Sequence, residues 1–253
     1  MISTAVRVFL VIAIVFSLAL PIGAVVYWRR TRKDVRWRPI LVGALTFVLF
    51  ALVLEPLLHQ ICLVADNPIS RAINGNPYLY MLYGGLAAGI FEETGRYLAF
   101  RFPLRRDLER DTAVSYGIGH GGIEVILVYG AAMISLLVLA VAPQTLADVP
   151  GGADAAAQLD ALSVGGVLLG MFERVMAMLF HIALSIFVFV AARDRTQRSY
   201  FPFAVALHAI ADMPAALYQK GVLPMAAVEI WMAVVTLYAL RSARKLFLEE
   251  TDP

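Results

Sequence analysis

Acidic, basic and histidine residues recur one helical turn apart in the middle of this sequence. Residues four apart share one face of an α-helix, and three pairs have this spacing: Glu92 and Arg96, His120 and Glu124, and His208 and Asp212. Arg174 and His181 lie about 20° apart at 100° per residue, and Ser185 falls on the same stripe. The spacing predicts that these side chains point into one place from several helices.

These residue types suit proton transfer and hydrolysis. The adjacent carboxylates of Glu92 and Glu93 cannot easily both ionise in a low-dielectric place, so one could act as a general base. Arg96 could hold the other in a charge-assisted pair. Histidines can shuttle protons or donate to an oxyanion, and Asp212 could orient His208. The set suits amide hydrolysis by activated water, and it also suits proton relay in a transporter.

Composition places these residues in a membrane. Of 253 residues, 60% are hydrophobic and 16% charged, against about 25% charged in a typical soluble domain. This excludes a disordered chain and an ordinary soluble enzyme, and a single cysteine excludes a disulfide scaffold. The net charge of +2 gives no reason to expect a nucleic-acid partner. The length fits about seven or eight transmembrane helices at roughly 20 residues each.

We therefore predict an all-α polytopic membrane protein with one integral-membrane domain over residues 1–253. Each predicted span should be helical, because lipid offers no partner to an unpaired backbone amide. The fourth span is longer than needed and could break at its glycines, Gly117, Gly119, Gly121 and Gly122. The seven predicted spans are residues 5–28, 39–64, 78–102, 112–142, 164–192, 200–218 and 223–240.

Loop charge predicts the orientation. Lys and Arg concentrate in the segments 29–38, 101–111, 193–199 and the C-terminal tail, whereas the alternate loops hold Arg71 and Lys220. The positive-inside rule then predicts a plasma-membrane protein with its N-terminus outside and its C-terminus in the cytoplasm. The loop over 143–163 is rich in Ala, Gly, Asp and Pro and is expected to be a flexible external connection.

Charged residues inside the spans predict one buried polar site. A charge at the bilayer centre costs about 2.5–3.5 kcal/mol on insertion scales, so such residues should pair or serve a function. Counted along their own spans at 1.5 Å per residue, Glu93, His120, His181 and His208 lie roughly 12–18 Å from the predicted inner surface. We expect spans 3–6 to bring these four residues together.

The residues themselves resemble a known family. The strings Glu92-Glu93-Thr94-Gly95-Arg96, Gly119 to Glu124, Glu173-Arg174 through His181, and His208 to Asp212 are similar to those of the YhfC family of intramembrane peptidases. They look more distantly like the PrsW proteases, the CAAX-processing (CPBP) proteases and the APH-1 subunit. The resemblance to YhfC covers most of the chain, and that to the wider group covers spans 3–6.

The resemblance implies an intramembrane peptidase that cleaves a protein or peptide substrate within or near the bilayer. Glu92 or Glu93 would activate the water, His181 would assist, and His208 with Asp212 would stabilise the oxyanion. Glu124 stands where the PrsW pattern has a glutamate. Arg96 follows Glu93 by three residues, whereas CAAX-processing proteases space this arginine by four, and Asp212 stands where they have asparagine; both departures argue against prenyl-protein processing.

Several alternatives stay open beside this glutamate mechanism, which needs no cofactor. The same groups could bind zinc, and the candidate ligands are then His120, Glu124, His181 and His208. A proton-coupled transporter or a non-catalytic scaffold like APH-1 would use them otherwise. We expect supporting roles for Glu173, Arg174 and Ser185. Glu55 and His59, also four apart, are expected to form a solvated pair near a span end.

Overall fold

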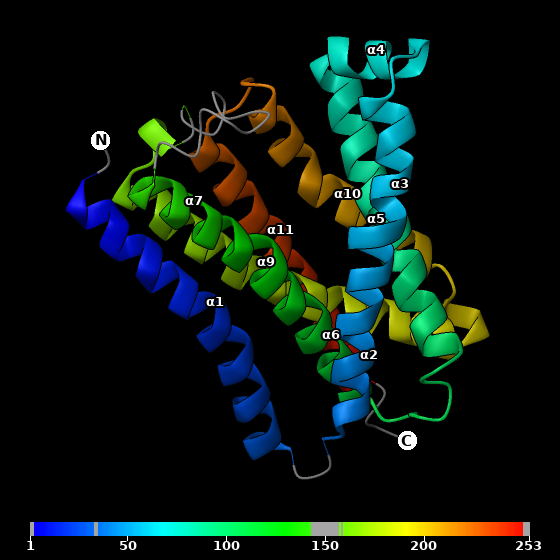
Figure 1. The fold of residues 1–253 in the computed structure, drawn as a ribbon. Coiled ribbons are helices and arrows are strands. Elements are labelled where there is room, and N and C mark those ends of the chain that lie inside the picture. Colours follow the sequence, from blue (N-terminus) through cyan, green and yellow to red (C-terminus); the bar gives the residue numbers. More distant parts are fainter. Residues whose placement is uncertain (1–2, 33–34, 143–156, 158, 250–253) are drawn as a thin grey trace.

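A computed structural model shows a bundle of long helices (Figure 1). It describes residues 3–32, 35–142, 157 and 159–249, and no strand occurs among these. The predicted external connection over 143–163 lies largely outside this part of the chain. The all-α architecture predicted from composition is confirmed.

Within the described residues, seven long helical segments correspond to the seven predicted spans. Two of them are divided by π-helical turns, and a short helix, α4 (Pro68–Gly75), joins the second segment to the third. The segments are α1 (Thr4–Thr31); α2 (Trp37–Leu49) with η1 (Phe50–Leu54), α3 (Glu55–His59) and η2 (Gln60–Val64); α5 (Pro77–Arg101); α6 (Asp111–Glu124) with η3 (Val125–Gly130) and α7 (Ala131–Val141); α9 (Val164–Arg193); α10 (Tyr200–Gln219), preceded by η5 (Arg195–Gln197); and α11 (Met225–Glu249).

Six of these segments are long and apolar enough to cross a membrane, counted over the residues that the structure describes. The third, α5, is not among them, because two glutamates, two arginines and four glycines lower its hydropathy. The chain is therefore a polytopic membrane protein, and the predicted count of seven to eight spans stays a prediction. α5 is the helix that carries Glu92, Glu93 and Arg96.

Capping residues explain where the site helices begin. The Asn76 side chain accepts hydrogen bonds from the first amides of α5, which has Pro77 at its first position. The Ser163 hydroxyl accepts from the Gly166 amide at the start of α9. Both are preferred N-cap residues, since they satisfy amides that have no partner within the helix.

Glycines allow the site helices to pack closely. α6 contacts both α2 and α9, and α5 contacts α10. A Cβ atom added to Gly119 would collide with the Ile40 carbonyl of α2, and one added to Gly117 would lie 2.6 Å from Ile182 Cα of α9. Small residues at such contacts are typical of membrane helices. These glycines therefore bring His120, which follows them, against its neighbours.

Irregular turns interrupt two of the long segments. The predicted break in the fourth span lies one turn later than expected: the π-helical η3 begins at Val125, directly after the glycine run and Glu124. In the second span, η1 and η2 flank the α3 turn that holds Pro56. π-Helical turns are frequent at functional sites, and here they adjoin Glu124 and the Glu55–His59 pair.

α10 contains a proline whose effect is compensated by a neighbouring helix. Pro214 has no backbone N–H, so the Ile210 carbonyl one turn earlier loses its usual partner. The Trp231 indole N–H of α11 donates to this carbonyl at 2.9 Å. Membrane helices tolerate proline when a neighbour satisfies the freed group in this way.

The basic segments meet at one end of the bundle. Arg36 pairs with Asp107 at 2.9 Å, Arg193 donates to the Asp107 carbonyl at 2.9 Å, and Arg110 donates to the Phe247 carbonyl. At the opposite end, Lys220 donates to the Asn74 carbonyl of α4 at 3.3 Å. Which end faces the cytoplasm stays a prediction.

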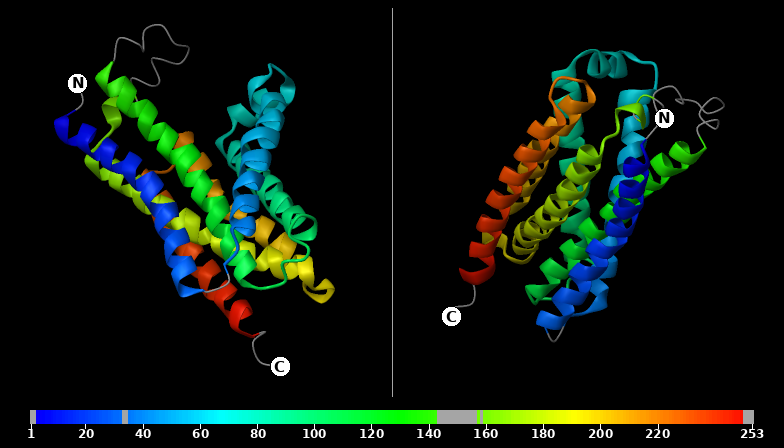
Figure 2. Two further views of the ribbon diagram at one scale, coloured as in Figure 1. Left: turned by 60° about the horizontal axis from the view of Figure 1, so that its bottom comes forward. Right: turned by 90° about the vertical axis from the view of Figure 1, so that its left-hand side faces the viewer.

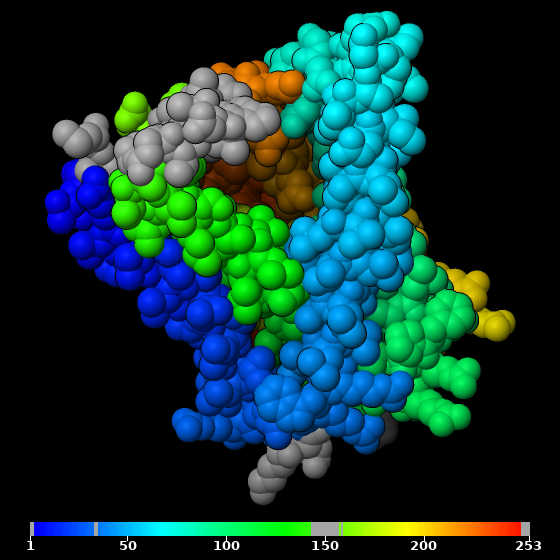
Figure 3. Space-filling model, viewed as in Figure 1, coloured from blue at the N-terminus to red at the C-terminus, as the bar shows by residue number. Residues whose placement is uncertain are grey.

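The helices form two groups that diverge toward the α4 end. The turned views of Figure 2 show α1 running beside α6 and α7 on one side and the second segment with α5 on the other, and the two sides are joined where α2 contacts α6. In the space-filling view, the surface is hollowed between α7 and the upper half of the second segment. Atoms of α10 and α11 form the floor of this hollow (Figure 3). The groups converge toward the basic end.

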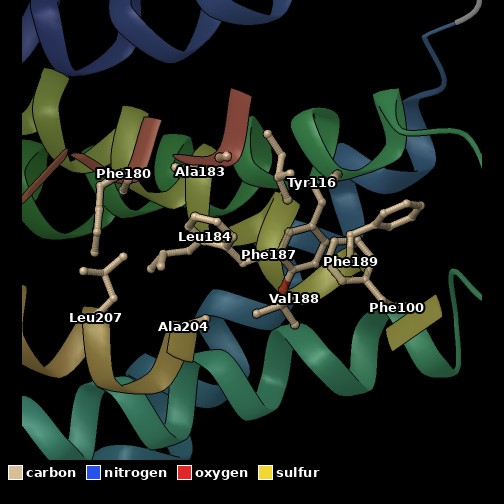
Figure 4. Close-up of a cluster of buried hydrophobic side chains, with 14 of the residues drawn as sticks. Phe100, Tyr116, Phe180, Ala183, Leu184, Phe187, Val188, Phe189, Ala204 and Leu207 are labelled. Carbon is tan, nitrogen blue, oxygen red and sulfur yellow. The ribbon is translucent and has the colours of Figure 1, made fainter. Parts of the chain in front are cut away.

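The largest buried apolar cluster lies at that basic end. Phe100 of α5, Tyr116 of α6, Leu184 and Phe187 of α9 and Ala204 of α10 belong to it, and Figure 4 shows their side chains interdigitating. Phe100 contacts the Tyr116 ring with 4.8 Å between centroids. On α5, α9 and α10, this cluster occupies the helix halves between the predicted site residues and the basic loops.

Candidate metal centre

Three histidine rings from three helices stand in a row above this cluster. The ring of His120 (α6) lies 4.7 Å from that of His181 (α9), which lies 5.4 Å from that of His208 (α10), measured between centroids. All three are 4% exposed or less. The three histidines that were predicted to lie at one depth in the membrane are therefore in direct contact.

The two glutamates of α5 contact different histidines. Glu92 Oε2 lies 2.8 Å from His120 Nε2. Glu93 Oε1 lies 2.7 Å from His208 Nδ1, and Glu93 Oε2 accepts a hydrogen bond from Arg96 at 3.1 Å. Arg96 therefore holds Glu93, three residues away, rather than Glu92, four away. Both oxygens of Glu93 are engaged, and its side chain and that of Arg96 are fully buried.

Hydrogen bonding assigns the tautomer of His181. An Arg96 nitrogen lies 3.0 Å from His181 Nδ1, and a guanidinium can only donate. Nδ1 therefore accepts, and the ring proton is on Nε2, which lies 2.7 Å from Glu124 Oε2. A histidine between an orienting group and a carboxylate is held in a fixed rotation.

A second arginine closes the network on the side of α9. Arg174 pairs with Glu124 at 2.8 Å and with its neighbour Glu173. These side chains are only 15–20% exposed. Two carboxylates around one guanidinium satisfy its donors in a place where a lone charge would be costly. Glu173 and Arg174 thus support Glu124, which in turn contacts His181.

Asp212 contacts the remaining ring nitrogen of His208. Its Oδ2 lies 3.4 Å from His208 Nε2, and Glu92 Oε1 lies 3.9 Å from the same atom. The Asp212 side chain is 39% exposed. His208 therefore has carboxylates at both nitrogens, and one of these carboxylates is open to a neighbouring space.

A cavity of about 220 Å³ reaches the network. Its polar lining includes carboxylates and histidines from four helices, and its apolar lining includes Phe180 and Met232. Ligand sites commonly combine an apolar wall with a few convergent polar groups. The polar lining consists of Glu92, Glu124, Glu173, Arg174, His181, His208 and Asp212.

Three of the buried groups are arranged as a metal could use them. One ligand atom from each of Glu92, His120 and His181 can be chosen so that all lie within 4.8 Å of one another. Histidine nitrogen and carboxylate oxygen are zinc ligands, and three protein ligands are typical of a catalytic zinc site. His120 Nδ1 is buried and has no hydrogen-bond partner among the described residues. The donor set therefore fits zinc.

The structure brings together all eight residues predicted as catalytic. They form one connected network over α5, α6, α9 and α10, with Glu173 and Arg174 at its edge. Ser185 does not reach the carboxylates, because its hydroxyl donates to the His181 carbonyl within α9 at 2.6 Å. The compact ligand set also differs from the predicted one: it contains Glu92 in place of Glu124 and His208.

The prediction for the pair Glu55 and His59 is partly wrong. Glu55 is only 9% exposed and lies 3.3 Å from His59, so the expectation of a solvated pair at a span end is wrong for Glu55. His59 Nδ1 also lies 2.7 Å from the Tyr83 hydroxyl of α5. The i, i+4 spacing marked the pair, but burial by α5 depends on tertiary packing that spacing does not reveal.

Comparison with known proteins identifies the family of this chain. A family model described as the YhfC intramembrane metalloprotease matches residues 16–247. The chain is 34% identical over 260 residues to the uncharacterized membrane protein YhfC of Bacillus subtilis (strain 168), covering 98% of this chain and 100% of that protein. No solved structure matches. The more distant resemblance to the PrsW and CAAX-processing proteases stays a prediction. The metalloprotease description favours the zinc alternative over the glutamate mechanism, and the chain belongs to the YhfC intramembrane metalloprotease family.

Proposed function

We propose that this protein is a zinc-dependent intramembrane peptidase that hydrolyses a peptide bond of a membrane or membrane-associated protein. The observation that carries the proposal is the convergence of Glu92, His120 and His181 on one buried point from three helices. The family description supports the same chemistry. The cavity beside these residues has room for part of a polypeptide chain.

In this proposal Glu92, His120 and His181 hold the metal. Zinc in such a site supplies a Lewis acid for a peptide carbonyl and for water. His181 would offer Nε2 to the metal, and Glu124 Oε2 lies 2.7 Å from this nitrogen and is held in turn by Arg174. Arg96 donates to the other ring nitrogen, Nδ1, and a group bound there fixes the rotation of a ligating histidine, so Arg96 is a positioning residue for His181 and Arg174 is one for Glu124.

His208 is the group we assign to proton transfer. Glu93 holds its Nδ1 at 2.7 Å, and its Nε2 points toward Glu92 and Asp212 beside the cavity. A histidine fixed in this way can deliver a proton to a leaving amine or donate to a developing oxyanion. Asp212 assists by orienting the ring from the open side.

The contacts of α5 favour the zinc mechanism over direct activation of water by a glutamate. Glu93 uses one oxygen for Arg96 and the other for His208 and does not line the site cavity, so it is poorly placed to activate a water molecule there. Glu92 belongs to the ligand set. In the zinc mechanism the carboxylate pair has two separate tasks, with Glu92 binding the metal and Glu93 positioning His208.

Cleavage before and after metal removal tests this function. The protein is reconstituted into liposomes with a pool of single-span membrane peptides, and products are identified by mass spectrometry. We expect cleavage to stop after treatment with a zinc chelator and to return with added zinc. We expect His208→Ala to lose cleavage by about 100-fold or more while retaining zinc.

The same assay separates the mechanisms. Cleavage that survives metal removal but disappears in Glu92→Gln would replace zinc by a glutamate mechanism. If no peptide is cleaved in the zinc-loaded protein, or if cleavage survives both changes, the peptidase assignment to this site is wrong.

A further inference from the structure

We propose that water reaches the site through a second polar cavity, lined by His59, Tyr83 and Asp212, between the second segment, α5 and α10. The proposal rests on the proposed function, because peptide hydrolysis consumes one water molecule per bond. The site itself is deeply buried in an apolar bundle, so water needs a route.

The second cavity adjoins the site cavity directly. It has a volume of about 230 Å³ and shares two lining residues, Asp212 and Ala215, with the site cavity. A space of roughly 10–15 Å³ on this measure suffices for one water molecule, so the cavity holds several. Asp212 therefore stands between the two spaces, with His208 at 3.4 Å on its site side.

Ionisable and hydroxyl side chains line part of the second cavity, at a depth where lipid-facing helices are apolar. His59 Nδ1 lies 2.7 Å from the Tyr83 hydroxyl, and His59 Nε2 lies 3.3 Å from Glu55. At the outer end, the Tyr80 hydroxyl donates to the Gln219 side chain at 3.0 Å. Ionisable residues within membrane segments usually face a bundle interior or a water-filled space.

Backbone irregularity places this polar wall. The α3 turn that carries Glu55 and His59 lies between two π-helical turns, and such turns change which face of a helix a residue occupies. Glu55 is thereby turned inward against α5 and is buried. A pair that only braced two helices would need no adjacent cavity, whereas a water route requires one.

The experiment must distinguish this route from a second possible route for water. A larger cavity of about 650 Å³, lined by residues of η3, α7 and α9 such as Tyr129, Met133 and Val167, contains Gln219 as well. It occupies the side of the hollow seen beside α7 in Figure 3. Within the described part of the chain, no histidine or carboxylate lines it, whereas His59 and Asp212 line the second cavity, so the second cavity is the one that offers water a path to the site.

Cysteine accessibility tests the route without needing a substrate. In a Cys62→Ser background, which has no other cysteine, we introduce Ala215→Cys and measure its reaction with a charged, membrane-impermeant thiol reagent. Membrane vesicles are used in the orientation in which Ala72→Cys, on exposed α4, is labelled. We expect Ala215→Cys to react, and Ala204→Cys, at a fully buried position of the same helix, to resist.

A second experiment blocks the cavity with a larger side chain. Gly84 lines it, and a Cβ added there meets only Ala216 Cβ at 3.7 Å, so Gly84→Ala fits, whereas Gly84→Phe fills the space. We expect Gly84→Phe to slow labelling of Ala215→Cys at least tenfold and Gly84→Ala to leave it within twofold. Gly23→Phe, at a position where an added Cβ meets nothing, controls for bulk in the membrane.

Either of two results would overturn the route. One is an Ala215→Cys that resists the reagent while Ala72→Cys reacts. The other is labelling that Gly84→Phe leaves unchanged, which assigns access to the larger cavity beside α7. Labelling depends on neither zinc nor cleavage, so a failed peptidase assay leaves this test intact, and a failed labelling test leaves the peptidase assay intact.

Discussion

The two halves of the bundle differ in how they are filled. Between the histidine row and the basic loops, α5, α9 and α10 pack the apolar cluster around Phe100 and Phe187. Between the same row and the α4 end, the helices diverge around three cavities: the second cavity shares Asp212 and Ala215 with the site cavity and Gln219 with the larger one. The polar network lies at the boundary.

Because its two halves differ, one bundle combines a rigid support for the site with space through which water and substrate can reach it. Buried ion pairs are costly unless their geometry is fixed, and the packed half fixes the backbones that carry Glu93, Arg96 and His181. The open half leaves space beside Asp212 and His208. A site closed on one side and open on the other can hold ligands firmly and still admit water and a peptide chain.

The largest effect is expected where the network meets the packed half. Glu93→Ala leaves the fully buried Arg96 without its carboxylate, which should lower the free energy of unfolding by about 3–5 kcal/mol. Chemical unfolding in detergent micelles measures it. Glu173→Ala is the matched control, because Arg174 keeps Glu124, and its loss should stay below about 1 kcal/mol. Equal losses would contradict the distinction.

Truncation of an aromatic residue should give the next largest difference in stability between the two halves. Phe187→Ala opens a void in the apolar cluster and should cost about 3 kcal/mol in unfolding free energy. Tyr218→Ala, at a 47% exposed position beside the larger cavity, should stay within about 0.5 kcal/mol. Similar values from the same unfolding titration would show that the two halves are filled equally.

A glycine substitution tests how closely the helices of the packed half approach one another. Gly119→Ala forces α6 away from the Ile40 carbonyl and should cost about 1–3 kcal/mol through overpacking. Gly23→Ala on exposed α1 should lose nothing. Thermal unfolding of the two variants in detergent is the measurement, and an unaffected midpoint for Gly119→Ala would mean that the two helices can separate at no cost.

The smallest effect is expected in the open half. Trp231→Phe removes the donor to the Ile210 carbonyl that Pro214 leaves free and should cost about 1 kcal/mol. Tyr238→Phe, at a 54% exposed position of the same helix, is the reference. Indistinguishable unfolding curves for the two variants would show that this carbonyl is satisfied in another way.

Sequence reasoning predicted the helices and the set of residues that meet, because spacing, depth and the cost of intramembrane charge are local properties. It could not predict the pairings. Whether Arg96 binds Glu92 or Glu93 depends on rotamers, and the ligand set depends on how α5 is rotated against α6. Glu55 shows the same limit, since its burial depends on the position of α5.

Zinc content tests the central claim most directly. The protein and four histidine variants are purified with zinc present, dialysed and measured by mass spectrometry for metal per chain. We predict about one zinc per chain in the unmodified protein, His208→Ala and His59→Ala, and less than a tenth of that in His120→Ala and His181→Ala. A folded protein without zinc, or zinc that persists in both His120→Ala and His181→Ala, would contradict the metal centre proposed here.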